Sequence, residues 1–276
     1  MIKIVPLVEN TTESSQYRAK HGLSLYIETK NHKILFDLGP NDLFLKNAAK
    51  LGVKIDEIDT VVISHGHVDH CGGLGAFLNA NSKAKIYLRP QAVEKHYVKV
   101  LAIPFYAGIN AQLVKGDRFV FVDDDVCIVD DEITLFSNVH GTCKLPKADD
   151  NLLVKKNGKI VPDDFAHEQN LIISSDGTKT LFCGCSHAGI VNIVDKAAQV
   201  CGRMPETVVG GFHLFEPTKK KYEKGDYIAM ISKELKQRGA DYYTCHCTGV
   251  KAYEAMKEQG LKLRYLHTGT VCRLYE

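Results

Sequence analysis

The amino-acid sequence predicts a single α/β domain, in which two similar layers of strands and helices pack into a sandwich. Runs of β-branched and aromatic residues typical of strands recur along the whole 276-residue chain, and amphipathic helical patterns lie between some of them in both halves. No linker rich in Pro, Gly or Ser separates the halves, so we expect one domain that spans residues 1–276.

The expected strands are short apolar runs that end at polar or turn-forming residues. They are Ile2–Val8, Leu23–Ile27, Ile34–Asp37, Val61–Ser64, Ile86–Leu88, Phe119–Val122, Ile133–Phe136, Leu171–Ser174, Leu181–Cys183, Val208–Gly210 and Tyr242–Cys245. Helices are expected over Phe44–Leu51, Ile190–Ala197, Ile228–Leu235 and Val250–Met256, because apolar residues recur there on one face. The polar, turn-rich stretch Lys144–His167 is interpreted as a surface excursion.

Composition favours a small-molecule partner over nucleic acid or a membrane. The formal net charge is only +2, and no apolar stretch is long enough to span a bilayer. The N-terminal residues show no signal-peptide pattern, so a cytoplasmic location is expected, and homo-oligomer formation is left open. Nine cysteines are an odd number spread over a chain large enough to fold without crosslinks, and we expect them to be reduced.

The densest chemical motif follows the apolar strand that ends at Ser64. Its residues are His65-Gly66-His67-Val68-Asp69-His70, which supply three imidazoles and a carboxylate within six positions. In a loop that leaves a strand, residues two apart point the same way, so His65 and His67 can bind one ion while Asp69 and His70 reach a neighbouring one. The motif predicts a site for one or two divalent metal ions. Zinc is expected first, with manganese or iron as alternatives.

This loop cannot complete the coordination alone, so distant strands must contribute ligands. His187 in Gly184–Gly189 and His246 in Thr244–Gly249 both follow an apolar strand and precede a helix, as the first motif does. Each is a predicted ligand, although a hydrogen-bonded structural histidine is the simpler interpretation of either one alone. His213 also follows a strand and is assigned to substrate or to supporting contacts. His140 and His167 are weaker candidates for an additional ligand.

The motif His65-x-His67-x-Asp69-His70, together with Ile34–Gly39 upstream, resembles the signature of the metallo-β-lactamase superfamily. Further segments are similar to the branch named for dihydropterin-ribofuranosyl-aminobenzene phosphate synthase. These are Leu7–Asn10, His21–Ser24, Gly184–Ile190, Gly210–Leu214 and His246–Gly249. The resemblance implies a four-layer αββα sandwich with two mixed sheets and helices outside. It also implies that Asp37 supports the loop beneath the metals.

One departure from the superfamily pattern concerns the strand Leu181–Cys183. Superfamily hydrolases commonly end this strand with Gly-Asp, whose carboxylate bridges two metals, whereas Gly184 here is followed by Cys185. Either the Cys185 thiolate is a ligand or His187 takes over. We favour His187 as the ligand, with Cys185 close by.

Three classes of function are compatible with these residues. The first is a hydrolase in which Asp69 ligates and shuttles a proton, while metal-bound hydroxide attacks a small anionic phosphoester or lactone-like substrate. Thr248 and Gly249, before a helix, would hold the substrate's anionic group, unless Thr248 is only a helix cap. The second is a transferase joining a pterin-methyl diphosphate to an aminobenzene ribotide, as the branch resemblance implies.

A ring-binding pocket lined by residues such as Phe105, Tyr106 and Phe212 would favour the transferase. The third class is a non-catalytic metal or redox module built on Cys183-x-Cys185 and Cys245-x-Cys247. This class leaves Asp69 without a role.

Overall fold

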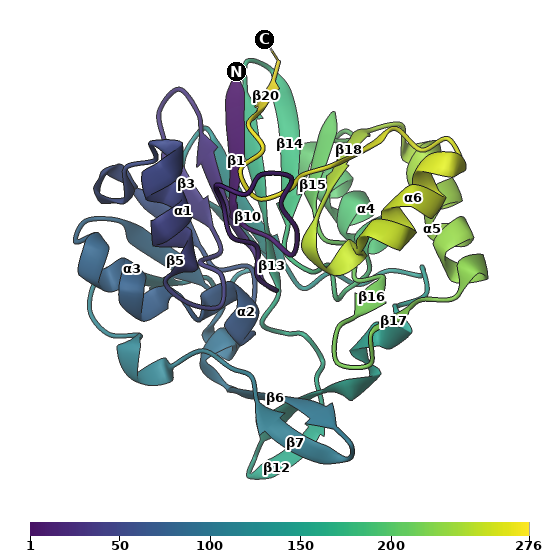
Figure 1. The fold of residues 1–276 in the computed structure, drawn as a ribbon, viewed down its shortest axis with the longest axis horizontal. Helices are drawn as coiled ribbons and strands as arrows, with labels where there is room; N and C mark the ends of the chain where they lie inside the picture. The colour runs from purple at the N-terminus through teal and green to yellow at the C-terminus, as the bar shows by residue number, and fades with distance from the viewer. Residues whose placement is uncertain (276) are drawn as a thin grey trace. The chain divides into compact units, whose positions relative to one another are not determined.

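The computed structural model describes residues 1–275, which divide into two compact units. Unit 1 comprises Met1–Asp123, Leu152–Gln169 and His267–Glu276, and unit 2 comprises Asp124–Asn151 and Asn170–Leu266. Each unit is built around one seven-stranded mixed sheet with helices beside it (Figure 1). The expectation of one domain over the whole chain stays a prediction.

The main sheet of unit 1 combines an antiparallel half with a parallel half. Its order is β20 (Cys272–Leu274), β1 (Ile2–Val8), β2 (Ser24–Glu28), β3 (Lys33–Phe36), β4 (Thr60–Val62), β5 (Lys85–Leu88) and β8 (Phe119–Phe121). The strands from β3 to β8 are parallel, so the residues that follow β3 and β4 emerge at the same sheet edge. The helices are α1 (Leu43–Leu51), α2 (Val68–Cys71) and α3 (Leu74–Ala80). Figure 1 shows α1 and α3 beside this sheet.

Unit 1 also contains an antiparallel four-stranded sheet that the sequence did not predict. Its order is β12 (Lys159–Pro162), β11 (Leu152–Lys156), β6 (Lys95–Val100) and β7 (Ile103–Tyr106). Strands β11 and β12 lie inside Lys144–His167, so this stretch contains regular strands and is not only a turn-rich excursion. Its lysine-rich sequence carries no clear apolar alternation, because only Val154 of β11 is buried and β12 is largely exposed.

Unit 2 is built around four neighbouring parallel strands. The sheet order is β19 (Leu263–Tyr265), β18 (Asp241–Thr244), β15 (Thr207–Gly210), β14 (Thr178–Cys183), β13 (Gln169–Ser175), β10 (Ile133–Ser137) and β9 (Val126–Ile128). The parallel strands are β14, β15, β18 and β19. The helices α4 (Ile190–Cys201), α5 (Gly225–Arg238) and α6 (Val250–Glu258) lie beside this sheet (Figure 1). A short hairpin joins β16 (Phe215–Glu216) to β17 (Lys221–Tyr222).

Each unit has its own apolar core, and the predicted helices supply much of it. In α1, Phe44 and Ala48 are fully buried, and the helix ends at Gly52, which adopts a left-handed φ of 69°. In unit 2, Ile193 of α4 and Leu235 of α5 are buried in the same cluster. No helix in the described part of the chain is long and apolar enough to cross a membrane.

Candidate metal centre

The histidine-rich motif of unit 1 forms a tight turn followed by one helical turn. His67 precedes α2, and the carbonyl of Ala107 accepts a hydrogen bond from the Val68 N–H at 2.8 Å. His65, His67 and His70 are buried, whereas the side chain of Asp69 is 21% exposed. The segment is thus half helical rather than an extended loop, and Asp69 is its most accessible polar group.

Asp37 fixes the position of the histidine-rich motif through three short contacts. Its carboxylate accepts hydrogen bonds from the Ser64 N–H and the Ser64 hydroxyl, both at 2.7 Å, and lies 2.6 Å from Nδ1 of His70. Asp37 is fully buried and has a left-handed φ of 63°, which a residue other than glycine rarely adopts. The contact with Nδ1 fixes the His70 ring and leaves Nε2 as its outward nitrogen.

Three residues that the sequence undervalued lie beside His67. His96 of β6 places Nδ1 2.9 Å from a carboxylate oxygen of Asp163, and Nε2 of His167 lies 3.3 Å from the same oxygen. Nε2 of His67 is 3.7 Å from it. One nitrogen or oxygen of each of these four residues lies within 4.8 Å of the others. We call His67, His96, Asp163 and His167 the imidazole cluster.

Buried surroundings keep the imidazole cluster in the protonation states that bind metals. Burial lowers the pKa of His67 and lowers that of His167 to about 3, so both rings are neutral near pH 7. Burial alone would raise the pKa of Asp163, but its hydrogen bonds with His167 and His96 and the nearby His67 ring outweigh burial and hold that pKa well below its usual range. Neutral imidazoles and an ionised carboxylate are the ligands of divalent zinc, manganese and iron. The donor set therefore fits a divalent metal ion.

The lowered pKa of His167 predicts a stability that falls in mild acid. The unfolded chain binds a proton to this ring near pH 6.5, whereas the folded chain does so only near pH 3. Between these values the unfolded state binds more protons, so the free energy of unfolding decreases as pH falls, by at most about 1.4 kcal/mol per pH unit for this group. Urea unfolding of metal-free protein between pH 7 and pH 4 measures the slope. His167→Gln should reduce the slope, and an unchanged slope would contradict the prediction.

Asp69 connects the motif to a histidine near the N-terminus. Its carboxylate lies 3.3 Å from Nε2 of His21, which is 41% exposed, and 3.6 Å from Nε2 of His70. The Asp69 carbonyl accepts a hydrogen bond from the Leu23 N–H, so the backbones of the two segments are also joined. The side chains of Asp69 and His21 form a polar path from the motif to the surface of unit 1.

In unit 2, the predicted residues follow the carboxyl ends of three parallel neighbours. Cys185 and His187 follow β14, His213 follows β15, and His246 follows β18. Ser186, His213 and His246 have φ values of 62°, 49° and 50°, in the left-handed region that residues other than glycine rarely occupy. Backbone strain of this kind is typical of functional sites, where it holds side chains in orientations that packing alone would not produce.

Asp149 joins two of these histidines from the 3₁₀ turn η4 (Lys147–Asn151). Its Oδ1 lies 2.6 Å from Nδ1 of His187 and 3.1 Å from Nε2 of His213. A carboxylate that binds one ring nitrogen orients the other toward a metal or substrate. Asp149 is a functional residue that the sequence analysis missed, because it stands among polar residues of an irregular segment.

Two buried cysteines lie next to His213. One ligand atom each of Cys185, His213 and Cys247 lies within 4.8 Å of the others, and the His213 N–H donates to Sγ of Cys247 at 3.3 Å. Burial would raise the pKa of Cys247, but hydrogen bonds with Cys185 and His213 outweigh it and hold that pKa well below its usual range. All nine cysteines are free.

Gly211 has no side chain, which leaves space for Sγ of Cys247. A Cβ at position 211 would lie 2.4 Å from Sγ of Cys247 and 2.9 Å from the Gly184 carbonyl oxygen. We therefore expect Gly211→Ala to lower the free energy of unfolding by about 1–3 kcal/mol through overpacking. Urea denaturation measures this effect. The exposed Gly225→Ala, where a Cβ would meet open space, is the control, and equal stability of the two variants would contradict the prediction.

Other predicted residues have structural contacts. The Thr248 hydroxyl accepts a hydrogen bond from the Phe212 N–H, and the Thr248 and Gly249 N–H groups donate to the carbonyls of Cys245 and His246. These two N–H groups are engaged within the turn, and the anion site expected at Thr248 and Gly249 stays a prediction. Phe212 is buried against Tyr242, whereas Phe105 and Tyr106 are about half exposed on β7.

The predicted ligands divide between the two units. His65, His67, Asp69 and His70 belong to unit 1, whereas His187 and His246 belong to unit 2. Their assignment as metal ligands stays a prediction. Of the weaker candidates, His167 belongs to the imidazole cluster, and His140 is an exposed residue of unit 2.

Known proteins similar to this chain agree with a metal-binding fold. The chain is 29% identical to 7,8-dihydropterin-6-methyl-4-(β-D-ribofuranosyl)-aminobenzene-5'-phosphate synthase of Methanocaldococcus jannaschii, over 99% of this chain and 96% of that protein. It is also 29% identical to the uncharacterised protein MJ0448 of that organism, over 98% and 99% of the two chains. The crystal structure of Tm1679, described as a metal-dependent hydrolase of the β-lactamase superfamily, matches with a TM-score of 0.85, 29% identity and full coverage of both chains.

The family comparison confirms the predicted fold class. The mixed sheets and helices match the metallo-β-lactamase fold, which implies divalent metal binding. Residues 17–193, more than half of the chain, match the model of the metallo-β-lactamase superfamily. The chain belongs to the metallo-β-lactamase superfamily.

Proposed function

We propose that this protein is a metal-dependent hydrolase that acts on a small anionic substrate, such as a phosphoester or a lactone. The observation that carries the proposal is the imidazole cluster, whose three buried imidazoles and one carboxylate converge within 4.8 Å. Three imidazoles and one carboxylate whose ligand atoms lie this close together are a donor set that suits a divalent metal ion.

The residues of unit 1 have different roles in the proposed reaction. His67, His96 and Asp163 would hold a divalent ion, and His167, whose Nδ1 accepts a hydrogen bond from the Gly66 N–H, would orient Asp163 through Nε2. His65 and His70 lie beside this group, with their ring centroids 4.1 Å apart. When bound, such an ion polarises a substrate oxygen and makes water acidic enough to act as a nucleophile near neutral pH. Asp37 keeps the His70 ring in one orientation, which preserves the geometry of the site during turnover.

Asp69 is the proposed general base. Its carboxylate is partly exposed, lies next to the motif, and can accept a proton from the attacking water. His21 at 3.3 Å can receive that proton and release it to solvent, because its own side chain is 41% exposed. Asp69 and His21 therefore supply the proton transfer that hydrolysis requires, without using a buried imidazole.

A transferase is the second candidate, and the relative from Methanocaldococcus jannaschii favours it. That protein is named as a synthase and matches this chain over nearly its full length, with 29% identity. Tm1679 is described as a hydrolase and matches with the same identity. In the transferase, Asp69 would deprotonate a substrate rather than a water molecule. The non-catalytic redox alternative leaves the imidazole cluster and Asp69 without a role.

Two assays on the same preparation distinguish the two enzyme classes. The first measures hydrolysis of bis-p-nitrophenyl phosphate and of a chromogenic lactone. The second measures condensation of a pterin-methyl diphosphate with an aminobenzene ribotide, followed by release of diphosphate. Hydrolysis that requires added zinc or manganese and is lost in Asp69→Asn supports the hydrolase. Metal-dependent condensation with no hydrolysis of either ester would contradict it and favour the transferase.

A further inference from the structure

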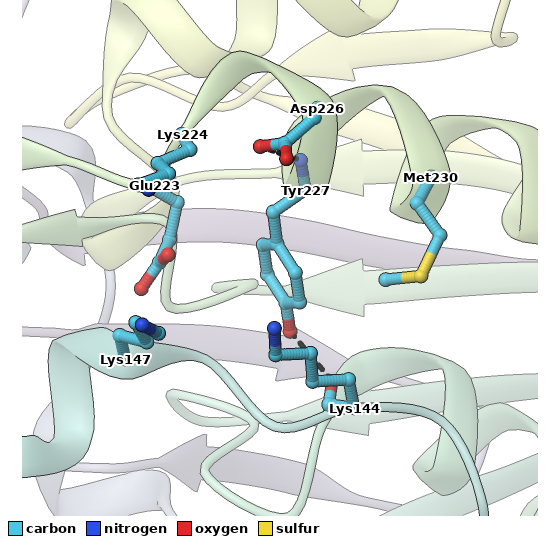
Figure 2. Close-up of a pocket in the computed structure, with 7 residues that line it drawn as sticks. All are labelled: Lys144, Lys147, Glu223, Lys224, Asp226, Tyr227 and Met230. Carbon is cyan, nitrogen blue, oxygen red and sulfur yellow. Dashed lines mark hydrogen bonds between the residues drawn. The ribbon is translucent and has the colours of Figure 1, made fainter.

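A pocket of unit 2 lies outside the histidine clusters and is rimmed by lysines (Figure 2). It has a volume of about 210 Å³ and lies between η4 and the start of α5. Its lining residues are Lys144, Lys147, Glu223, Lys224, Asp226, Tyr227 and Met230. A second pocket of about 160 Å³ shares Lys147, Glu223 and Lys224 with it. Because a water molecule occupies roughly 30 Å³, each pocket has room for a phosphate group and several waters.

The carboxylates around the two pockets are mostly engaged. Glu223 accepts a hydrogen bond from the Ala148 N–H at 2.7 Å, and Asp226 accepts one from the Tyr227 N–H at 2.9 Å. Glu216 accepts hydrogen bonds from Asn151 and forms an ion pair with Lys219 at 3.2 Å. The ion pair with Lys219 offsets the charge of Glu216, whereas the backbone hydrogen bonds orient Glu223 and Asp226 without removing their charge.

Four lysines at these pockets keep their charge available. Among residues 1–275, Lys144, Lys147, Lys221 and Lys224 make no ion pair with a carboxylate. In Figure 2 the Glu223 carboxylate points toward the end of the Lys147 side chain, and Met230 borders the other side of the opening. Beside these four lysines stand the carboxylates of Asp150, Glu223 and Asp226, so the two pockets keep an excess of one positive charge. An excess of positive charge around a concave surface favours an anion.

The backbone joins this pocket to the histidines of unit 2. Lys147 begins η4, and two residues later Asp149 contacts both His187 and His213. The Ala148 N–H donates to Glu223, which follows β17, and the hydroxyl of Tyr227 in α5 donates to the Lys144 carbonyl at 2.8 Å, so the segment that carries Lys144 and Lys147 is held at two points. Lys147 is therefore held two residues away from Asp149, the carboxylate that contacts His187 and His213.

We propose that the two joined pockets bind a phosphate group of the ligand, held chiefly by Lys147 and Lys224. The identification of that ligand as the substrate rests on the proposed function. The substrate would then be a small molecule that carries a phosphate away from the bond that reacts. The simpler interpretation, solvated lysines on a polar surface, predicts no saturable binding and no dependence on these two positions.

Phosphorus NMR titration with inorganic phosphate tests the proposal at constant ionic strength. It is made on the protein as purified and after removal of metal, because a bound metal would itself bind phosphate. The variants are Lys147→Gln/Lys224→Gln, with Lys233→Gln on the exposed face of α5 as the control. We expect saturable binding in both wild-type samples, about tenfold weaker binding in the double variant, and unchanged binding in the control. Binding that is non-saturable, or equal in all variants, would overturn the proposal.

Kinetics separate this inference from the proposed function. For an ester that carries a second, remote phosphate, we expect the double variant to raise KM about tenfold and to leave kcat unchanged. For an ester without that phosphate, both constants should stay the same. Phosphate binding without hydrolysis of any ester would contradict the proposed function and leave the phosphate site standing. Hydrolysis with no phosphate binding in the metal-free protein would contradict only the phosphate site.

Discussion

Replacement of Asp69 by asparagine is expected to lower kcat for ester hydrolysis by a factor of about 10²–10⁴, the usual contribution of a positioned general base. Asparagine keeps the size of the side chain and the backbone hydrogen bond from Leu23, but it cannot accept the proton. Steady-state kinetics of metal-loaded protein measures the effect. His21→Gln should give a smaller loss, because solvent can replace an exposed relay.

Asp42→Asn is the matched control for this experiment. Asp42 is an exposed carboxylate before α1 that forms an ion pair with Lys46, so its loss should leave kcat unchanged. Circular dichroism establishes that both variants are folded. An Asp69→Asn enzyme that retains more than half of the wild-type kcat would exclude Asp69 as the general base.

Replacement of His167 by alanine is expected to weaken metal binding by about 10- to 100-fold, the usual contribution of a residue that orients a metal ligand. Nε2 of His167 lies 3.3 Å from the Asp163 carboxylate, which it would orient. Alanine also leaves the Gly66 N–H, which donates to Nδ1 of His167 at 2.8 Å, without its partner. Competition with a chromogenic chelator measures the affinity, and hydrolysis should be lost in parallel.

His140→Ala provides the matched control, because His140 is exposed and lies in unit 2. From the sequence, His140 and His167 are equally weak candidates for a metal ligand, whereas the structure places only His167 in the imidazole cluster. The control should keep wild-type metal affinity. Equal affinity of His167→Ala and wild type would remove His167 from the metal site and leave the imidazole cluster without its proposed role.

The central strands of the main sheets could be predicted because they are buried and consist of continuous apolar runs. The edge strands β9, β19 and β20 are only partly buried and were not predicted. Val61–Val62 and Leu181–Phe182 are fully buried, and the helices end at glycines that adopt left-handed φ values, as at Gly52 and Gly239. Such signals are local, so the sequence alone reveals them. The polar residues that follow these strands were located for the same reason.

Asp149, Asp163 and His96 could not be predicted, because their partners are distant in the chain. His96 pairs with Asp163 across 67 residues, and Asp149 pairs with His187 across 38 residues. The strands β6, β11 and β12 that carry or precede His96 and Asp163 lie in an exposed sheet, where lysines replace the apolar alternation. Only the tertiary structure brings these donors to His67.

Metal removal and reconstitution test the central claim most directly. Wild-type protein is treated with a chelator, dialysed, and titrated with zinc or manganese, while bound metal is measured by inductively coupled plasma mass spectrometry and hydrolysis of bis-p-nitrophenyl phosphate is followed. We expect hydrolysis to vanish in the metal-free protein and to return in proportion to the metal bound, up to one or two ions per chain. Full activity in the metal-free protein, or no metal binding to wild type, would contradict the account.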